Sequence, residues 1–106
     1  GMMFALGIID RLTPGDLTGG LHVAGTGTIT QSGEVGPIGG VVQKLYGASR
    51  SGATVFLAPA ANCKEIVGNV PDGLRVVKIE TLQQALDALE KLSADEQVES
   101  LPSCTN

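Results

Sequence analysis

The sequence predicts an α/β fold in which helices flank a β-sheet. Extended and helical patterns alternate along the chain, giving strand, helix, strand, short helix, strand and helix in order. The run ATVFLA at Ala53–Ala58 is apolar without interruption, which is typical of a strand covered on both faces. At 106 residues the chain has room for one domain with a modest core.

The first third of the chain is predicted to hold one helix and several short extended segments. Residues 2–12 are apolar on nearly every side, as in a helix buried inside a domain, although Ile8-Ile9 would also tolerate a strand. Residues 13–20 are rich in turn residues and are predicted to form a loop. The expected extended segments are Leu21–Ala24, Gly27–Thr30 and, after a hairpin-like turn at Gln31–Glu34, Val35–Ile38.

A glycine pair leads into the second helix. Pro37 lacks a backbone donor and Gly39-Gly40 lacks Cβ atoms, so this connection can bend tightly and lie close to other backbone. We expect a helix over Ile38–Gly47, followed by a polar connection up to Gly52. Apolar residues at helical spacing define its buried face: Val41, Val42, Leu45 and Ala48.

Lys44 lies at the rim of that buried face, one turn beyond Val41. Two interpretations fit its spacing. The stem can pack on the core while the charged amine extends into solvent. Alternatively, the amine is held away from bulk water, where it loses its proton more readily and can act as a general base. Spacing alone does not choose between them.

The C-terminal half is predicted to contain a short helix, a strand and a long helix. Ala60–Val67 favours the short helix, and Leu74–Ile79 alternates apolar and charged residues as a half-exposed strand does. Thr81 is a suitable N-cap for the last helix, whose apolar stripe is the clearest pattern in the chain. That stripe consists of Leu82, Ala85, Leu86, Leu89 and Leu92. Residues 93–106 have no periodicity and are predicted to form a flexible acidic tail.

Composition argues against several functions. A formal charge of −4, scattered basic residues and only 3% aromatics are unsuited to binding nucleic acid. The apolar run at residues 2–9 is too short to cross a bilayer. Glycines in Ala24–Ile29 do not form a phosphate-binding motif, and His22 is interpreted as a strand residue. The spacing of Cys63 and Cys104 fits neither a zinc site nor a redox motif, so they are either separate thiols or one disulfide.

Two motifs carry a family resemblance. The pattern P-I-G-G-x-x-x-K is present at Pro37–Lys44, and T-G-x-I is present at Thr26–Ile29. Together with Gly33, the segment Val55–Pro59, Asn62 and the last helix, they make the chain resemble the proteolytic domain of the Lon family of serine peptidases. The resemblance covers residues 1–92, taken as the C-terminal part of that domain. The sequence looks most like the extracytoplasmic Lon-like proteases that pair this domain with a PDZ module.

The resemblance implies a Ser-Lys dyad without a cofactor or metal. Lys44 would be the general base, and the Thr26 hydroxyl would hold its amine, unless Thr26 is only a β-branched strand residue. The family's serine lies in a G-P-S-A-G turn whose last glycine aligns with Gly1, which places the nucleophile two residues upstream of this chain. The serines within the chain do not replace it: Ser32, Ser49, Ser51, Ser93, Ser100 and Ser103. We therefore expect the isolated chain, truncated at its N-terminus relative to the domain, to be inactive.

The resemblance also implies partners and a location. The intact protein would cleave peptides or unfolded proteins, assemble as a homo-oligomer (a hexameric ring in the family), and be extracytoplasmic or membrane-associated, with this portion soluble. An oxidising compartment would favour a disulfide between Cys63 and Cys104. Two alternatives remain: a non-catalytic oligomerisation module with the same fold, or a small-molecule-binding domain with its ligand near Gly25–Thr28. A residue other than serine at the centre of the upstream turn would favour the module, and a bound ligand would favour the third function.

Overall fold

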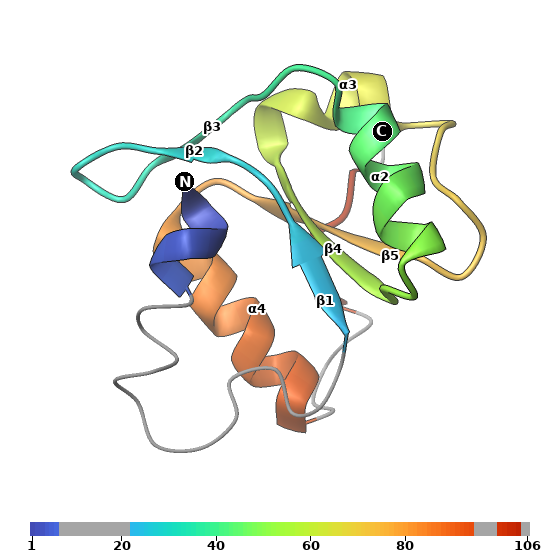
Figure 1. Cartoon of the computed structure of the whole chain (residues 1–106). Helices are drawn as coiled ribbons and strands as arrows, with labels where there is room; N and C mark the ends of the chain where they lie inside the picture. The colour runs from blue at the N-terminus through green and yellow to red at the C-terminus, as the bar shows by residue number, and fades with distance from the viewer. Residues whose placement is uncertain (7–21, 95–99, 105–106) are drawn as a thin grey trace.

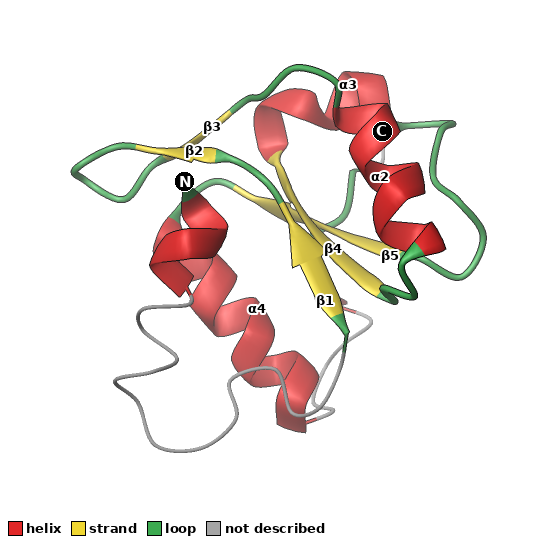
Figure 2. Ribbon diagram, viewed as in Figure 1, coloured by secondary structure: helices red, strands yellow, loops and turns green. Residues whose placement is uncertain are grey.

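The structure, a computed structural model, describes residues 1–6, 22–94 and 100–104. Its centre is a parallel sheet with the strand order β1-β4-β5. The strands are β1 (Val23–Gly25), β4 (Val55–Pro59) and β5 (Arg75–Ile79), with Val23 opposite Val55 and Val55 opposite Arg75. Helices lie on both faces of this sheet, which confirms the predicted α/β fold (Figure 2).

The continuous apolar strand β4 divides the core into two clusters. Val55 and Leu57 point to the face covered by α4 (Leu82–Ala94) and by the helical residues 2–6. Phe56 and Ala58 point to the opposite face, which is covered by α2 (Val41–Arg50) and α3 (Cys63–Ile66) (Figure 1). Because successive side chains of a strand alternate between faces, a strand buried on both must be apolar throughout, as predicted.

A second, two-stranded sheet is an antiparallel hairpin. It pairs β2 (Thr28–Ile29) with β3 (Val35–Gly36), and Thr28 lies opposite Gly36. The predicted turn at Gln31–Glu34 is present: the Gly33 N–H donates to Thr30 O at 3.0 Å, and the Glu34 N–H donates to Thr30 Oγ1 at 3.0 Å. This hairpin leads directly into the glycine pair.

Most predicted elements are present with shifted bounds. The helix expected at 38–47 is α2 at Val41–Arg50. The expected short helix is split into the 3-10 turn η1 (Ala60–Asn62) and α3. Thr81 caps α4 as predicted, since its Oγ1 accepts a hydrogen bond from the Gln84 N–H at 3.1 Å. Residues 2–6 of the predicted helix 2–12 are helical, whereas residues 7–21 lie outside the described part of the chain.

The interpretation of β5 as half exposed was wrong. Val76, Val77 and Ile79 are all buried, because α4 packs on one face and the α2–α3 layer packs on the other. Only Arg75 is exposed, and Lys78 is half-buried. β5 is an edge strand of the sheet, and its two charged residues do not define a solvent-facing side.

The last described segment of the chain, residues 100–104, returns to the sheet. Of residues 93–106, expected to form a tail, Ser93 and Ala94 complete α4, and 100–104 lie beside β5. There the Lys78 N–H donates to Pro102 O at 2.9 Å. Cys104 is buried and forms a disulfide with Cys63, with 4.9 Å between their Cα atoms. This is one of the two states that the sequence left open for the cysteines.

Candidate active site

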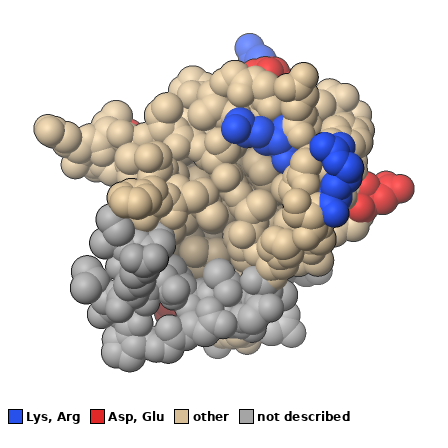
Figure 3. Space-filling model, viewed as in Figure 1, with Lys and Arg blue, Asp and Glu red and all other residues tan. Residues whose placement is uncertain are grey.

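Lys44 lies in the first turn and a half of α2, on its solvent side. Its backbone N–H donates to Gly40 O at 3.2 Å, and its neighbours Val41 and Leu45 are fully buried. The Lys44 side chain itself is exposed. Figure 3 shows basic side chains gathered over the half of the molecule that carries α2 and α3. Of the two sequence interpretations, the described chain therefore fits the solvent-directed lysine.

The start of α2 is set by an unusual backbone conformation. Gly40, the N-cap, has φ 69° and ψ 30°, in the left-handed region that residues with a Cβ adopt only at a cost. Gly39 shows no such angle, so the two glycines of the motif have different roles. The left-handed residue turns the chain sharply from the β3 connection into α2, and thereby sets the direction in which the helix begins.

Asn62 holds the backbone just before this turn. Its Oδ1 accepts a hydrogen bond from the Ile38 N–H at 3.0 Å, and its Nδ2 donates to Ile38 O at 2.9 Å. The second Nδ2 hydrogen is directed to Glu65 Oε1 at 3.1 Å. The Asn62 side chain is almost fully buried, at 1% exposed. Asn62 lies three residues after β4, and nothing in its spacing indicated a buried polar role.

Thr26 directly follows β1 and is half-buried. Its N–H donates to Leu57 O at 3.1 Å, which extends the parallel ladder by one bond beyond the strand. Val23 packs in the α4 cluster and Ala24 in the α2 cluster, so side chains alternate along β1. Continued alternation assigns Thr26 to the same face as Ala24, which is the face that α2 covers.

The beginning of the chain lies beside Thr26. The Met2 N–H donates to Gly27 O at 3.0 Å, and Met2 is fully buried against the sheet. The helical segment that starts there places Gly1 in contact with Gly27, since an added Cβ on Gly1 would lie 2.7 Å from Gly27 O. The carboxyl end of β1 thus brings together the first residues of the chain, Thr26 and the face on which α2 packs.

The serines within the described chain occupy other places. Ser32 is exposed in the hairpin turn, where its hydroxyl lies 3.0 Å from Thr30 Oγ1. Ser49 lies in the last turn of α2 and Ser51 is its C-cap, at the opposite end of that helix from Gly40. Ser93 lies in the last turn of α4 and its hydroxyl donates to Glu90 O, while Ser100 and Ser103 belong to the segment beside β5. The described serines thus lie in the hairpin turn, at the C-terminal ends of α2 and α4, and beside β5.

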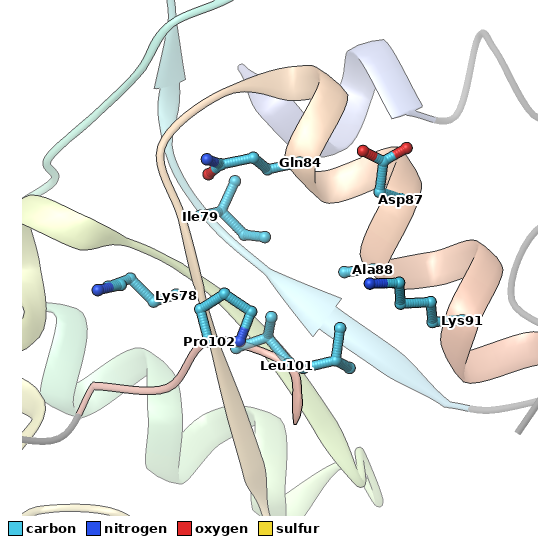
Figure 4. A pocket seen from close by; sticks show the side chains of 9 residues that line it. Lys78, Ile79, Gln84, Asp87, Ala88, Lys91, Leu101 and Pro102 are labelled. Carbon is cyan, nitrogen blue, oxygen red and sulfur yellow. The ribbon is translucent and has the colours of Figure 1, made fainter. Parts of the chain in front are cut away.

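A shallow pocket of about 170 Å³ lies elsewhere, at the outer edge of the sheet. It is bounded by β5, by α4 through Asp87 and Lys91, and by Leu101 and Pro102 of the C-terminal segment (Figure 4). Since β4 lies between β5 and β1, this pocket is separate from the Thr26 end of the sheet. It therefore gives no support to a ligand at Gly25–Thr28.

Two kinds of feature are absent from the described ranges. No group of three His, Cys, Asp or Glu side chains in residues 1–6, 22–94 and 100–104 gathers to hold a metal ion. Within the same ranges, no helix is both long and apolar enough to cross a bilayer.

Comparison with known proteins gives the family. Residues 1–92 match the family model of the Lon protease C-terminal proteolytic domain. The chain belongs to the Lon protease family. Among its relatives, the Lon protease of Heliobacterium modesticaldum is 39% identical over 89 residues, covering 77% of this chain and 11% of that protein. The Lon protease of Clostridioides difficile is 37% identical over 90 residues, covering 82% of this chain and 11% of its own length.

Lon protease 2 of Bacillus subtilis is 39% identical over 67 residues, which is 63% of this chain and 12% of that relative. The chain thus spans about a tenth of the length of these Lon proteases. The match to the Lon domain model ends at Leu92, so the C-terminal segment and Cys104 lie beyond it.

Proposed function

We propose that this chain supplies the general base of a Lon-type serine endopeptidase, with Lys44 as the base, Thr26 as its supporting hydroxyl and the nucleophilic serine upstream of Gly1. The observation that carries the proposal is the hydrogen bond from Met2 N–H to Gly27 O. This bond holds the first residues of the chain against Gly27, the residue that follows Thr26. A serine two residues before Gly1 would consequently extend from the carboxyl end of β1, where α2 also begins.

The chemistry follows from the residue types. A neutral lysine amine removes the proton of the serine hydroxyl as its oxygen attacks the carbonyl carbon of a peptide bond. The resulting ammonium returns the proton to the leaving amine when the C–N bond breaks, which leaves an acyl-enzyme. Water then hydrolyses that ester with the same lysine as base. The Thr26 hydroxyl has the role of orienting the amine towards the serine.

The exposure of Lys44 places a condition on this mechanism. A lysine becomes an effective general base where its amine is held away from bulk water. The proposed site therefore needs a cover over the Lys44 side of α2, supplied by the residues upstream of Gly1, by a neighbouring subunit or by the bound substrate. This condition supports assembly into a homo-oligomeric ring, hexameric as in the family, as part of the proposal.

The remaining parts of the proposal concern the intact protein. Its substrates would be peptides or unfolded proteins, because the relatives that the chain matches are Lon proteases. We assign it to the extracytoplasmic, PDZ-containing subgroup. The disulfide between Cys63 and Cys104 supports that assignment, because such bonds persist in oxidising compartments.

The test is turnover of unfolded casein by the complete protein that contains this chain. Lys44→Ala and Lys44→Arg should each lower kcat by at least about a thousandfold, since alanine has no base and arginine remains protonated. Lys64→Ala is the matched control, because Lys64 is an exposed lysine on the neighbouring helix α3. It should leave kcat unchanged. Circular dichroism should show that all three variants are folded.

Full turnover by folded Lys44→Ala would overturn the assignment of the base. Replacement of the residue two positions upstream of Gly1 tests the nucleophile in the same assay. If that residue is not a serine, the peptidase proposal fails and the oligomerisation module takes its place.

A further inference from the structure

We propose that Asn62 is a positioning residue for Lys44: its amide group fixes the backbone of Ile38 and thereby the place at which α2 begins. The inference rests on the proposed function, because it concerns the geometry of the proposed base. It adds a residue on a different element, η1, that would act through the protein and not on the substrate.

The hydrogen bonds of Asn62 are complete and directional. Its oxygen accepts from the Ile38 N–H, while its two amide hydrogens are directed to Ile38 O and Glu65 Oε1. An amide that both donates to and accepts from one residue imitates the paired bonds of an antiparallel ladder. Because Asn62 is almost fully buried, each of these bonds is costly to break.

The segment that Asn62 holds needs an external support. β3 ends at Gly36 and α2 begins at Val41, so residues 37–40 belong to neither element. Within this segment Pro37 has no N–H, and Gly39-Gly40 has the widest backbone freedom available to a chain. The two bonds to Ile38 offset that freedom immediately before the left-handed turn at Gly40.

Apolar packing alone does not determine where α2 lies along the sheet. Val41 and Leu45 bury the helix against Phe56 and its neighbours, but burial is non-directional and tolerates sliding. Hydrogen bonds at the start of the helix are directional, and the Lys44 N–H bonds to Gly40 O only two residues beyond Ile38. A shift of Ile38 therefore shifts the base. Displacement of a catalytic group by about 1 Å can lower a rate by roughly a hundredfold.

Asn62 is itself well anchored. It follows Pro59, which pairs with Ile79 at the end of β4, and it precedes Cys63, which is joined to Cys104. The two hydrogen bonds between Asn62 and Ile38 thus connect the end of the middle strand of the sheet to the start of α2, across 24 residues of sequence. A rigid support of this kind is what a positioning role requires.

The test compares Asn62→Ala and Asn62→Asp with Asn69→Ala in the complete protein. Asn69 is the matched control because its Nδ2 also donates to a backbone oxygen of α3, Glu65 O at 2.9 Å, without touching residues 37–40. The readouts are kcat and KM for a fluorescent casein substrate, and amide hydrogen exchange of peptides spanning residues 37–45, β4 and α4.

We expect Asn62→Ala to lower kcat by roughly 10- to 100-fold with KM changed less than about threefold. Exchange should quicken in residues 37–45 and stay slow in β4 and α4. Asn62→Asp keeps the acceptor for the Ile38 N–H but places a second acceptor oxygen against Ile38 O and Glu65 Oε1, so its kcat should fall and its exchange should quicken at least as much as in Asn62→Ala. Asn69→Ala should match the wild type in both readouts.

An unchanged kcat in Asn62→Ala would overturn the proposal, as would exchange that quickens equally in all three regions. If Asn62→Ala does not fold, the same comparison is made with Asn62→Ser, which keeps a short polar side chain at this position. If the proposed function is wrong, Lys44→Ala keeps full turnover, which separates that failure from failure of the Asn62 proposal. Hydrogen exchange in residues 37–45 still reports whether Asn62 holds Ile38.

Discussion

Thr26 and Asn62 are short polar residues near strand ends, and the roles proposed for them support a site without carrying its chemistry. Each follows a strand of the central sheet at its carboxyl end: Thr26 follows β1, and Asn62 lies three residues after β4. The backbone of Thr26 and the side chain of Asn62 are both tied to neighbouring chain by hydrogen bonds. The carboxyl ends of parallel strands are where α/β proteins place their functional groups.

At this scale we predict a modest role for the Thr26 hydroxyl. Thr26→Val keeps the shape of the side chain and removes one hydrogen bond to the proposed base. The loss should be about 1–2 kcal/mol, which corresponds to a fall in kcat of roughly 5- to 30-fold in the complete protein. Thr28→Val is the control, because Thr28 is exposed in β2, and it should change kcat little. Equal kcat for wild type and Thr26→Val would mean that Thr26 is only a strand residue.

At the scale of elements, the start of α2 depends on two glycines that differ in conformation. Gly40 adopts φ 69°, whereas a Cβ added to Gly39 would meet no atom within 4 Å. The P-I-G-G motif therefore contains one glycine required by its backbone angle and one that is not required by local crowding.

This difference predicts that only one of two alanine variants loses stability. Gly40→Ala should lower the free energy of unfolding by about 1–2 kcal/mol, because a Cβ in the left-handed region is unfavourable. Gly39→Ala should stay within about 0.5 kcal/mol of the wild type. Urea denaturation of the chain followed by circular dichroism measures both. A larger loss for Gly39→Ala than for Gly40→Ala would contradict the assignment of the helix start.

Helices and strands with a clear hydrophobic pattern in their own residues could be predicted from the sequence. Features that depend on contacts with residues far away in the chain could not. The apolar run of β4 and the apolar stripe of α4 each indicate burial from their own residues, and the family motif singled out Lys44 and Thr26 as candidate site residues. Asn62 gave no such signal in its spacing, since its partner Ile38 is 24 residues away. The packing of residues 100–104 beside β5 could not be predicted either, because these residues have no hydrophobic periodicity that would indicate a contact with the sheet. The exposure of Lys44 likewise depends on what packs around α2, which local sequence does not encode.

At the scale of the whole molecule, the disulfide lies on the α2–α3 face of the sheet, where both cysteines pack in the same cluster. Cys63 begins α3 on one face of the sheet, and the loop that the bond closes contains β5 and α4, which packs on the other. The sequence separation is 41 residues. In the chain-entropy estimate, closing a loop of that length stabilises the native state by roughly 4 kcal/mol.

We therefore predict that reduction destabilises the chain markedly. The urea midpoint of the oxidised chain should fall when a reductant is added, with a loss of about 2–4 kcal/mol in the free energy of unfolding. Cys63→Ser/Cys104→Ser should reproduce the reduced midpoint and should not respond to reductant. Thiol titration of the denatured, unreduced chain supplies the control, since two free thiols would show that the bond had not formed.

The same bond decides how a mechanical load would enter the protein. A pull applied at Cys104 passes through the disulfide to Cys63, and from there through η1 to β4 in the middle of the sheet. β5 and α4 lie off this path, so on the order of 140 Å of extended chain between the cysteines cannot be drawn out while the bond is intact. A force applied at Cys104 would therefore act on the fold at Cys63.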